Sequence, residues 1–117
     1  MAPGLVVMDD ILEFNLDGEE VNDDPRKVYL ERYIHSEIYR ERDDVEAIVH
    51  SHSHSVVPFS VVKSSPLKPM CHISGFIGTH VPIFEICDVV GDESNMLVTN
   101  KALGSSLTQS LGKIHSY

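Results

Sequence analysis

The sequence predicts an α/β fold in which helices are layered against a sheet. Two helix-like segments, near residues 25–42 and 96–111, alternate with two strand-like runs at residues 45–49 and 81–86. Such alternation is typical of layered α/β sandwiches. The chain has 117 residues, of which 42% are hydrophobic, so residues 1–117 are expected to form one domain that buries its own core.

The first element expected is a β-hairpin at the edge of the sheet. Residues 11–16 alternate between apolar and polar side chains. Asp17 and Gly18 supply a turn, and residues 19–21 can return as a second strand.

The first helix is predicted to run from residue 25 or 26 to residue 42. An Asn-Asp-Asp-Pro cluster at residues 22–25 offers a cap and a proline suited to the first turn. Leu30, Ile34 and Ile38 then recur every four residues, which predicts an apolar stripe on one face of the helix.

The second half of the chain continues the alternation. Residues 45–49 are apolar and rich in β-branched side chains, as expected for a central strand covered on both faces. Residues 56–62 favour a short helix over a strand, provided that its proline falls in the first turn, and residues 70–76 fit either state. Residues 81–86 are predicted as a strand, and residues 96–111 carry leucines at helical spacing up to a closing glycine.

Charge and cysteine content limit the partners and the compartment. With 9 basic against 18 acidic residues, the net charge of −9 would repel nucleic acid and anionic membranes, so neither is expected as a partner. Cys71 and Cys87 form no C-x-x-C pair. We expect no signal peptide and no membrane span, which needs ~18 apolar residues. A cytoplasmic protein with free thiols is therefore expected.

A His-Ser-His sequence directly follows the apolar run at residues 45–49. In an extended chain His50 and His52 point to the same side, while Ser51 points away. Zinc, manganese and iron bind imidazole nitrogen, so the pair could supply half of a coordination shell. The alternative is that the repeat is only a polar loop after a core strand.

The predicted first helix offers a carboxylate to the same site. Glu31 and His35 are four residues apart and border its apolar stripe. Glu31 could reach a metal at the histidine pair as a ligand or as an acid/base. His35 could contact one of the metal ligands without binding the metal itself. The alternatives are a surface ion pair of Glu31 with Arg32 or Lys27, and a histidine that merely donates to a backbone carbonyl.

The other histidines carry weaker signals. His72 could face the same cavity from another side, and His54 continues the alternation of the pair. His80 and His115 have no evident partner in the sequence. A cysteine nucleophile would require Cys71 to be activated by the adjacent His72, a geometry that sequence neighbours rarely have.

Glu31 precedes the first histidine of the pair, His50, by 19 positions. The class II aldolase/adducin family has a glutamate at the same distance before its His-x-His pair, and the chain resembles that family. The resemblance covers nearly the whole chain. It looks closest to the branch of hydroxy-methylpyridine-dicarboxylate decarboxylases rather than to sugar-phosphate aldolases. It continues through residues 58–59, 67–72, 75–76, 81–86, 95–98 and 111–112.

The resemblance implies a three-layer α/β/α sandwich, usually oligomeric, that binds a divalent metal through three histidines. Two of these correspond to His50 and His52, and Glu31 matches the family's acid/base. Zinc is expected, with manganese as the alternative. The implied activity is that of an aldehyde-lyase or carboxy-lyase acting on a small oxygenated molecule, in which the cation stabilises an enolate-like carbanion.

The resemblance also implies that this chain is a partial domain. The family's third histidine lies on a strand after the helix that is expected to end near Gly112, and the upstream loops that hold the substrate's anionic group have no counterpart here. Three readings therefore stay open. The chain is an active lyase, an inactive adducin-like interaction module, or a homo-oligomer in which His54, His72 or His115 of a neighbouring copy completes the site.

Overall fold

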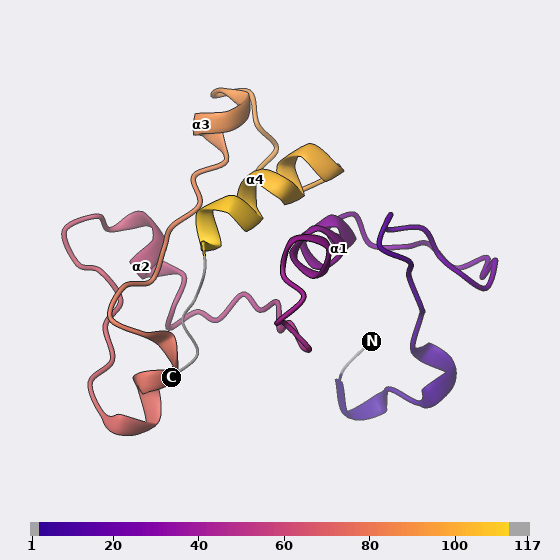
Figure 1. Cartoon of the computed structure of the whole chain (residues 1–117), viewed down its shortest axis with the longest axis horizontal. Helices are drawn as coiled ribbons and strands as arrows, with labels where there is room; N and C mark the ends of the chain where they lie inside the picture. Colours follow the sequence, from indigo (N-terminus) through magenta and orange to yellow (C-terminus); the bar gives the residue numbers. More distant parts are fainter. Residues whose placement is uncertain (1–2, 113–117) are drawn as a thin grey trace.

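The computed structural model describes residues 3–112, in which α-helices are joined by long irregular segments (Figure 1). The two longest helices, α1 and α4, pack against each other near the middle of the molecule, which extends over 45 × 36 × 29 Å. In chain order the elements are the 3₁₀ helices η1 (Pro3–Leu5) and η2 (Met8–Asp10), α1 (Arg32–Glu41), α2 (Pro58–Val61), the 3₁₀ helix η3 (His72–Ile77), α3 (Cys87–Val90) and α4 (Lys101–Leu111).

Helix α1 begins at Arg32, so the predicted start at residue 25 or 26 is wrong. At the predicted start, the Asp24 carboxylate accepts hydrogen bonds from the backbone N–H of Arg26 at 2.9 Å and from its guanidinium at 2.6 Å. This local side-chain contact holds the backbone in a turn that competes with the helix. The C-terminal end at Glu41 lies one residue from the prediction.

Helix α4 is capped at both ends. Asn100 has an extended backbone, and its side-chain oxygen accepts a hydrogen bond from the Leu103 N–H at 3.0 Å, which satisfies a free donor of the first turn. The predicted start at residue 96 is wrong, because Met96 adopts a φ of 63°, outside the helical region. Gly112, at a φ of 62°, ends the helix as expected.

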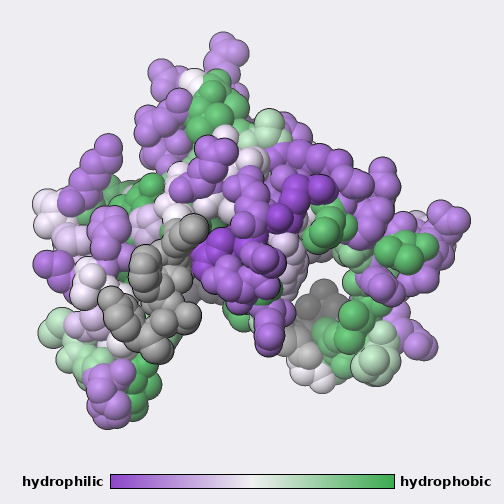
Figure 2. All heavy atoms as spheres, in the orientation of Figure 1, coloured by the Kyte–Doolittle hydropathy of each residue, from purple (hydrophilic) through white to green (hydrophobic). Residues whose placement is uncertain are grey.

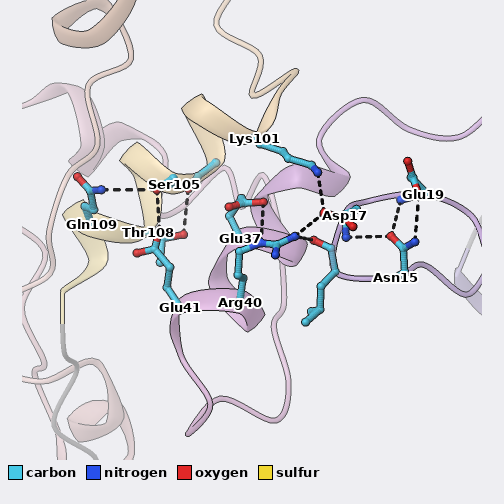
Figure 3. Close-up of polar contacts among 12 residues, drawn as sticks. Asn15, Asp17, Glu19, Glu37, Arg40, Glu41, Lys101, Ser105, Thr108 and Gln109 are labelled. Atoms are coloured by element: carbon cyan, nitrogen blue, oxygen red, sulfur yellow. Dashed lines mark hydrogen bonds and ion pairs between the residues drawn. The ribbon is translucent and has the colours of Figure 1, made fainter.

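Helices α1 and α4 approach most closely at Gly104. A Cβ atom added there would lie 2.5 Å from the Tyr33 carbonyl oxygen and 2.8 Å from Glu37 Cγ, so the crossing requires glycine. The hydroxyl of Ser105 donates to the Glu41 carboxylate across the same interface at 2.6 Å (Figure 3). A small core lies beside the crossing, with Ile86, Val98 and Leu103 at its centre and Tyr33, Ile34, Phe84, Cys87 and Leu107 around it.

The predicted hairpin forms only as a tight turn with one antiparallel bridge, between Phe14 and Glu20. Its tip is tied to the helix pair by Asp17, whose carboxylate lies 2.7 Å from Lys101 Nζ and 2.8 Å from the Arg40 guanidinium (Figure 3). Hydrogen bonds from Lys101 and then Arg40 hold the pKa of Asp17 below its usual value. Charge pairing thus attaches the turn to both α1 and α4.

The predicted three-layer α/β/α sandwich is wrong for the described residues. Residues 45–49 and 81–86 are not strands, and apart from the single bridge at the hairpin no strand pairing occurs between residues 3 and 112. A strand is stable only when its backbone groups pair with a neighbour, and neither run has one there. Val49, expected in a central strand, is accordingly 90% exposed.

The shorter elements of the second half agree better with the predictions made from the sequence. The helix expected within residues 56–62 forms as α2, with Pro58 in its first turn. The ambiguous segment at residues 70–76 becomes the 3₁₀ helix η3.

Large apolar side chains remain on the surface. Figure 2 shows them gathered over η3 at the lower left and over α3 at the top. Phe76 is 83% exposed, and Met70 and Ile73 beside it are also exposed. Apolar surface of this extent typically marks contact with another molecule. None of the helices described is long and apolar enough to cross a membrane.

Candidate functional site

The side chains of Glu31, His50 and His52 meet at one point. Glu31 directly precedes α1, and the histidines lie on the extended segment that follows this helix. The Nε2 atoms of His50 and His52 are 3.1 Å apart, and Nδ1 of His50 lies 4.0 Å from a carboxylate oxygen of Glu31. One ligand atom from each residue lies within 4.8 Å of the others. The structure therefore brings together the three residues that the sequence spacing selected.

Local backbone geometry produces this convergence without a sheet. Residues 49–53 have no regular secondary structure, yet His50 and His52 meet, whereas Ser51 and Ser53 line a separate cavity. This is the alternation expected of an extended chain. At Glu31 the side chain makes no capping hydrogen bond to α1, which leaves the carboxylate available to the histidines.

The cluster fits a divalent metal ion in its chemistry. Two imidazoles and a carboxylate form a donor set that zinc uses in enzymes. The 3.1 Å between the two Nε2 atoms is close to the ~3.3 Å separation of two ligands that each lie roughly 2.0 Å from a tetrahedral ion. The side chains of Glu31 and His50 are 23% and 29% exposed, whereas His52 is exposed, so a bound ion would be covered on the Glu31 side and open to solvent on the His52 side.

A row of aromatic rings supports the histidine pair from the side of α1. Phe14 of the hairpin meets Tyr29 edge-on, with ring centroids 6.0 Å apart, and Tyr29 meets His35 edge-on at 6.2 Å. His35 is followed by His50 at 6.4 Å, and His50 by His52 at 5.0 Å. Edge-on contacts of this kind are favourable and fix ring orientation. The hairpin is thus connected through ring contacts to the candidate metal ligands.

His35 lies in α1 next to His50, outside the group of candidate metal ligands. Partial burial, and to a smaller degree the nearby His50, hold the pKa of His35 below its usual value of 6.5. A neutral imidazole at this position adds no positive charge next to a bound cation.

Residues 3–114 match the family model of the class II aldolase and adducin N-terminal domain. The chain belongs to the class II aldolase and adducin family. The resemblance inferred from the spacing of Glu31 and the histidine pair is thereby confirmed.

Two relatives of this chain carry the names of lyases. The chain is 37% identical over 113 residues to the decarboxylase tropJ of Talaromyces stipitatus, a match that covers 93% of this chain and 42% of that protein. It is 42% identical over 50 residues to the L-fuculose phosphate aldolase of Methanocaldococcus jannaschii, a match that covers 43% of this chain and 26% of that protein. The chain therefore spans less than half the length of either relative.

The remaining candidate histidines do not join the cluster. Within residues 3–112, Glu31, His50 and His52 form the group of His, Cys, Asp and Glu side chains close enough to share a metal ion, and neither His54 nor His72 is a member. His72 is exposed at the start of η3. His115 lies outside the described residues.

Cys71 does not have the arrangement of an activated nucleophile with His72. Its sulfur lies 3.7 Å from the hydroxyl of Ser74 instead, and this contact lowers the pKa of the Cys71 thiol. Neighbouring residues of the 3₁₀ helix thus account for the environment of this thiol.

Two cavities near the cluster were not among the features predicted from the sequence. The first, here called the Glu31 cavity, has a volume of about 230 Å³ and is lined by Glu31 and by side chains from α1, α2, α4 and the segment before α3. The second, here called the Ser51 cavity, has a volume of about 320 Å³ and is lined by Ser51, Ser53 and mainly apolar residues. Their sequence signal is indirect and lies in the apolar run at residues 81–86, which forms part of both walls.

Proposed function

We propose that this chain contributes the cation-binding and proton-transfer groups of a metal-dependent lyase. The reaction is decarboxylation or aldol cleavage of a small oxygenated carboxylate or sugar-type molecule. The observation that carries the proposal is the convergence of Glu31, His50 and His52 within 4.8 Å. Membership of the class II aldolase family and the two lyase relatives support it. Zinc is the proposed ion, with manganese as the alternative.

In this proposal His50 and His52 hold the ion through imidazole nitrogen, and the ion supplies Lewis-acid polarisation of an oxygen next to the bond that breaks. Both decarboxylation and aldol cleavage leave an electron pair on a carbon atom. In the cleavage direction the Glu31 side chain, 4.0 Å from His50 and partly shielded from water, is assigned as the group that delivers a proton to that carbon, after taking this proton from the substrate hydroxyl in aldol cleavage or from water in decarboxylation. His35 and Tyr29 are assigned to holding the His50 ring in position.

The test is metal binding by the purified chain. Calorimetric titration with zinc or manganese should give a stoichiometric site, and His50→Ala or His52→Ala should each weaken binding by at least about tenfold. His80→Ala is a matched control, because His80 is an exposed histidine outside the cluster and is not among the candidate ligands. A chain that is folded by circular dichroism but binds neither ion would refute the proposal.

Glu31→Gln separates the two roles of the carboxylate. It keeps the shape of the side chain and removes its charge and proton-transfer capacity. Retained zinc binding with loss of lyase activity supports the acid/base assignment, whereas retained activity contradicts it.

A second candidate function is a non-catalytic interaction module, favoured by the exposed apolar surface over η3. Both candidates predict a homo-oligomer in the cytoplasm, and the free Cys71 and Cys87 agree with a reducing compartment. A stable monomer at dilute concentration in analytical ultracentrifugation would count against the oligomer and against the interaction module.

A further inference from the structure

We propose that the Glu31 cavity receives an uncharged, apolar body of the substrate, of a size up to two fused aromatic rings, while the substrate's oxygenated end faces the cluster. This inference rests on the proposed lyase function for the identity of the ligand as a substrate. The binding property itself depends only on the cavity.

The cavity is large enough and suitably lined. Its volume of about 230 Å³ exceeds the about 150 Å³ of apolar cavities that hold benzene. Ile34 of α1, Val61 of α2 and Leu107 of α4 line it, together with Phe84 and Met96. Burial of a ring against such walls is favourable in proportion to the apolar area removed from water.

The charges of the lining exclude an anionic body. The cavity is lined by two carboxylates, Glu31 and Glu85, and by no lysine or arginine. A phosphate group there would meet like charges with no lysine or arginine side chain in the lining to neutralise it. The cavity thus discriminates against phosphorylated substrates at this position.

Glu31 connects the cavity to the cluster. Glu31 belongs both to its wall and to the cluster with His50 and His52, so one end of a molecule filling the cavity would lie against the Glu31 side chain. Ser60, Ile83 and Phe84 line both this cavity and the Ser51 cavity. These three side chains therefore lie between the two cavities, and their movement would admit a longer apolar body.

The first experiment uses the wild-type chain in the absence of metal, with indole as the apolar probe and inorganic phosphate as the anionic probe. Methyl-region NMR reports on the Met96 and Val61 methyl groups, which line the cavity. Indole should shift these signals in a saturable manner, and phosphate should not. The inference is overturned if phosphate shifts them as strongly as indole, or if indole leaves them unchanged.

The second experiment fills the cavity. Val61→Trp should weaken indole binding at least about tenfold. Val62→Trp is the matched control, because Val62 is the next residue, is also exposed, and lines neither cavity. Equal effects of the two substitutions would overturn the inference.

Zinc titration of both variants distinguishes this inference from the proposed function. Unchanged zinc binding in Val61→Trp, with indole binding lost, supports a cavity separate from the metal ligands. Wild-type chain that binds indole but not zinc would refute the lyase proposal and leave the apolar binding site standing. The reverse result would refute the cavity inference alone.

Discussion

Replacement of Gly104 by alanine should separate the two central helices. The new Cβ would lie 2.5 Å from the Tyr33 carbonyl oxygen and 2.8 Å from Glu37 Cγ, and the first of these is a backbone atom that cannot rotate away. Overpacking of this kind costs about 1–3 kcal/mol, and a contact with rigid backbone belongs at the upper end. Alanine in a helix gains roughly 0.8–1.0 kcal/mol over glycine. The net loss of unfolding free energy is therefore about 2 kcal/mol.

Urea denaturation followed by far-UV circular dichroism measures this loss. With an m value of ~2 kcal/mol/M, the midpoint should fall by about 1 M. Gly75→Ala is the matched control, because a Cβ at Gly75 meets nothing within 4 Å and its backbone is not in the left-handed region. A Gly104→Ala chain as stable as Gly75→Ala would refute the close helix crossing.

Two further predictions concern a helix cap and the thiols. Asn100→Ala removes the acceptor of the Leu103 N–H and should lower stability by about 1 kcal/mol in the same urea assay, whereas an unchanged midpoint would contradict the cap. Iodoacetamide should alkylate the exposed Cys71 before Cys87, since the Ser74 hydroxyl lowers the pKa of Cys71 and burial raises that of Cys87. Peptide mass spectrometry at neutral pH should show slower Cys71 labelling in Ser74→Ala, and equal labelling of both thiols would contradict the assigned environments.

Features of the fold that depend on local interactions could be predicted from the sequence. The C-terminal end of α1, the proline in the first turn of α2 and the glycine after α4 depend on residues within a few positions, and each lies close to its predicted place. The residues of the candidate cluster could also be selected from the sequence, and their metal-binding and catalytic roles stay predictions. Glu31 and the His-Ser-His pair needed only a helix followed by an extended segment to meet.

The failures arose where distant segments must pair or where a side chain competes with the backbone. Residues 45–49 and 81–86 have strand-like composition, but composition does not supply a neighbouring strand. At the predicted starts of α1 and α4, the contact between Asp24 and Arg26 and the backbone of Met96 keep the chain out of the helical conformation, and neither feature alters the apolar periodicity that a pattern detects. The cavities could not be predicted for the same reason, because their walls come from separate parts of the chain.

Glu31 occupies a position where stability and function compete. Serine, asparagine or aspartate directly before a helix would typically stabilise it by about 1 kcal/mol through a side-chain hydrogen bond to a free backbone N–H. The Glu31 carboxylate makes no such bond and faces His50 instead. Helix α1 thus forgoes its best cap, and its first turn is a site at which stabilising substitutions would remove the carboxylate from the cluster. A search for more stable variants of this chain would therefore tend to select against the candidate site.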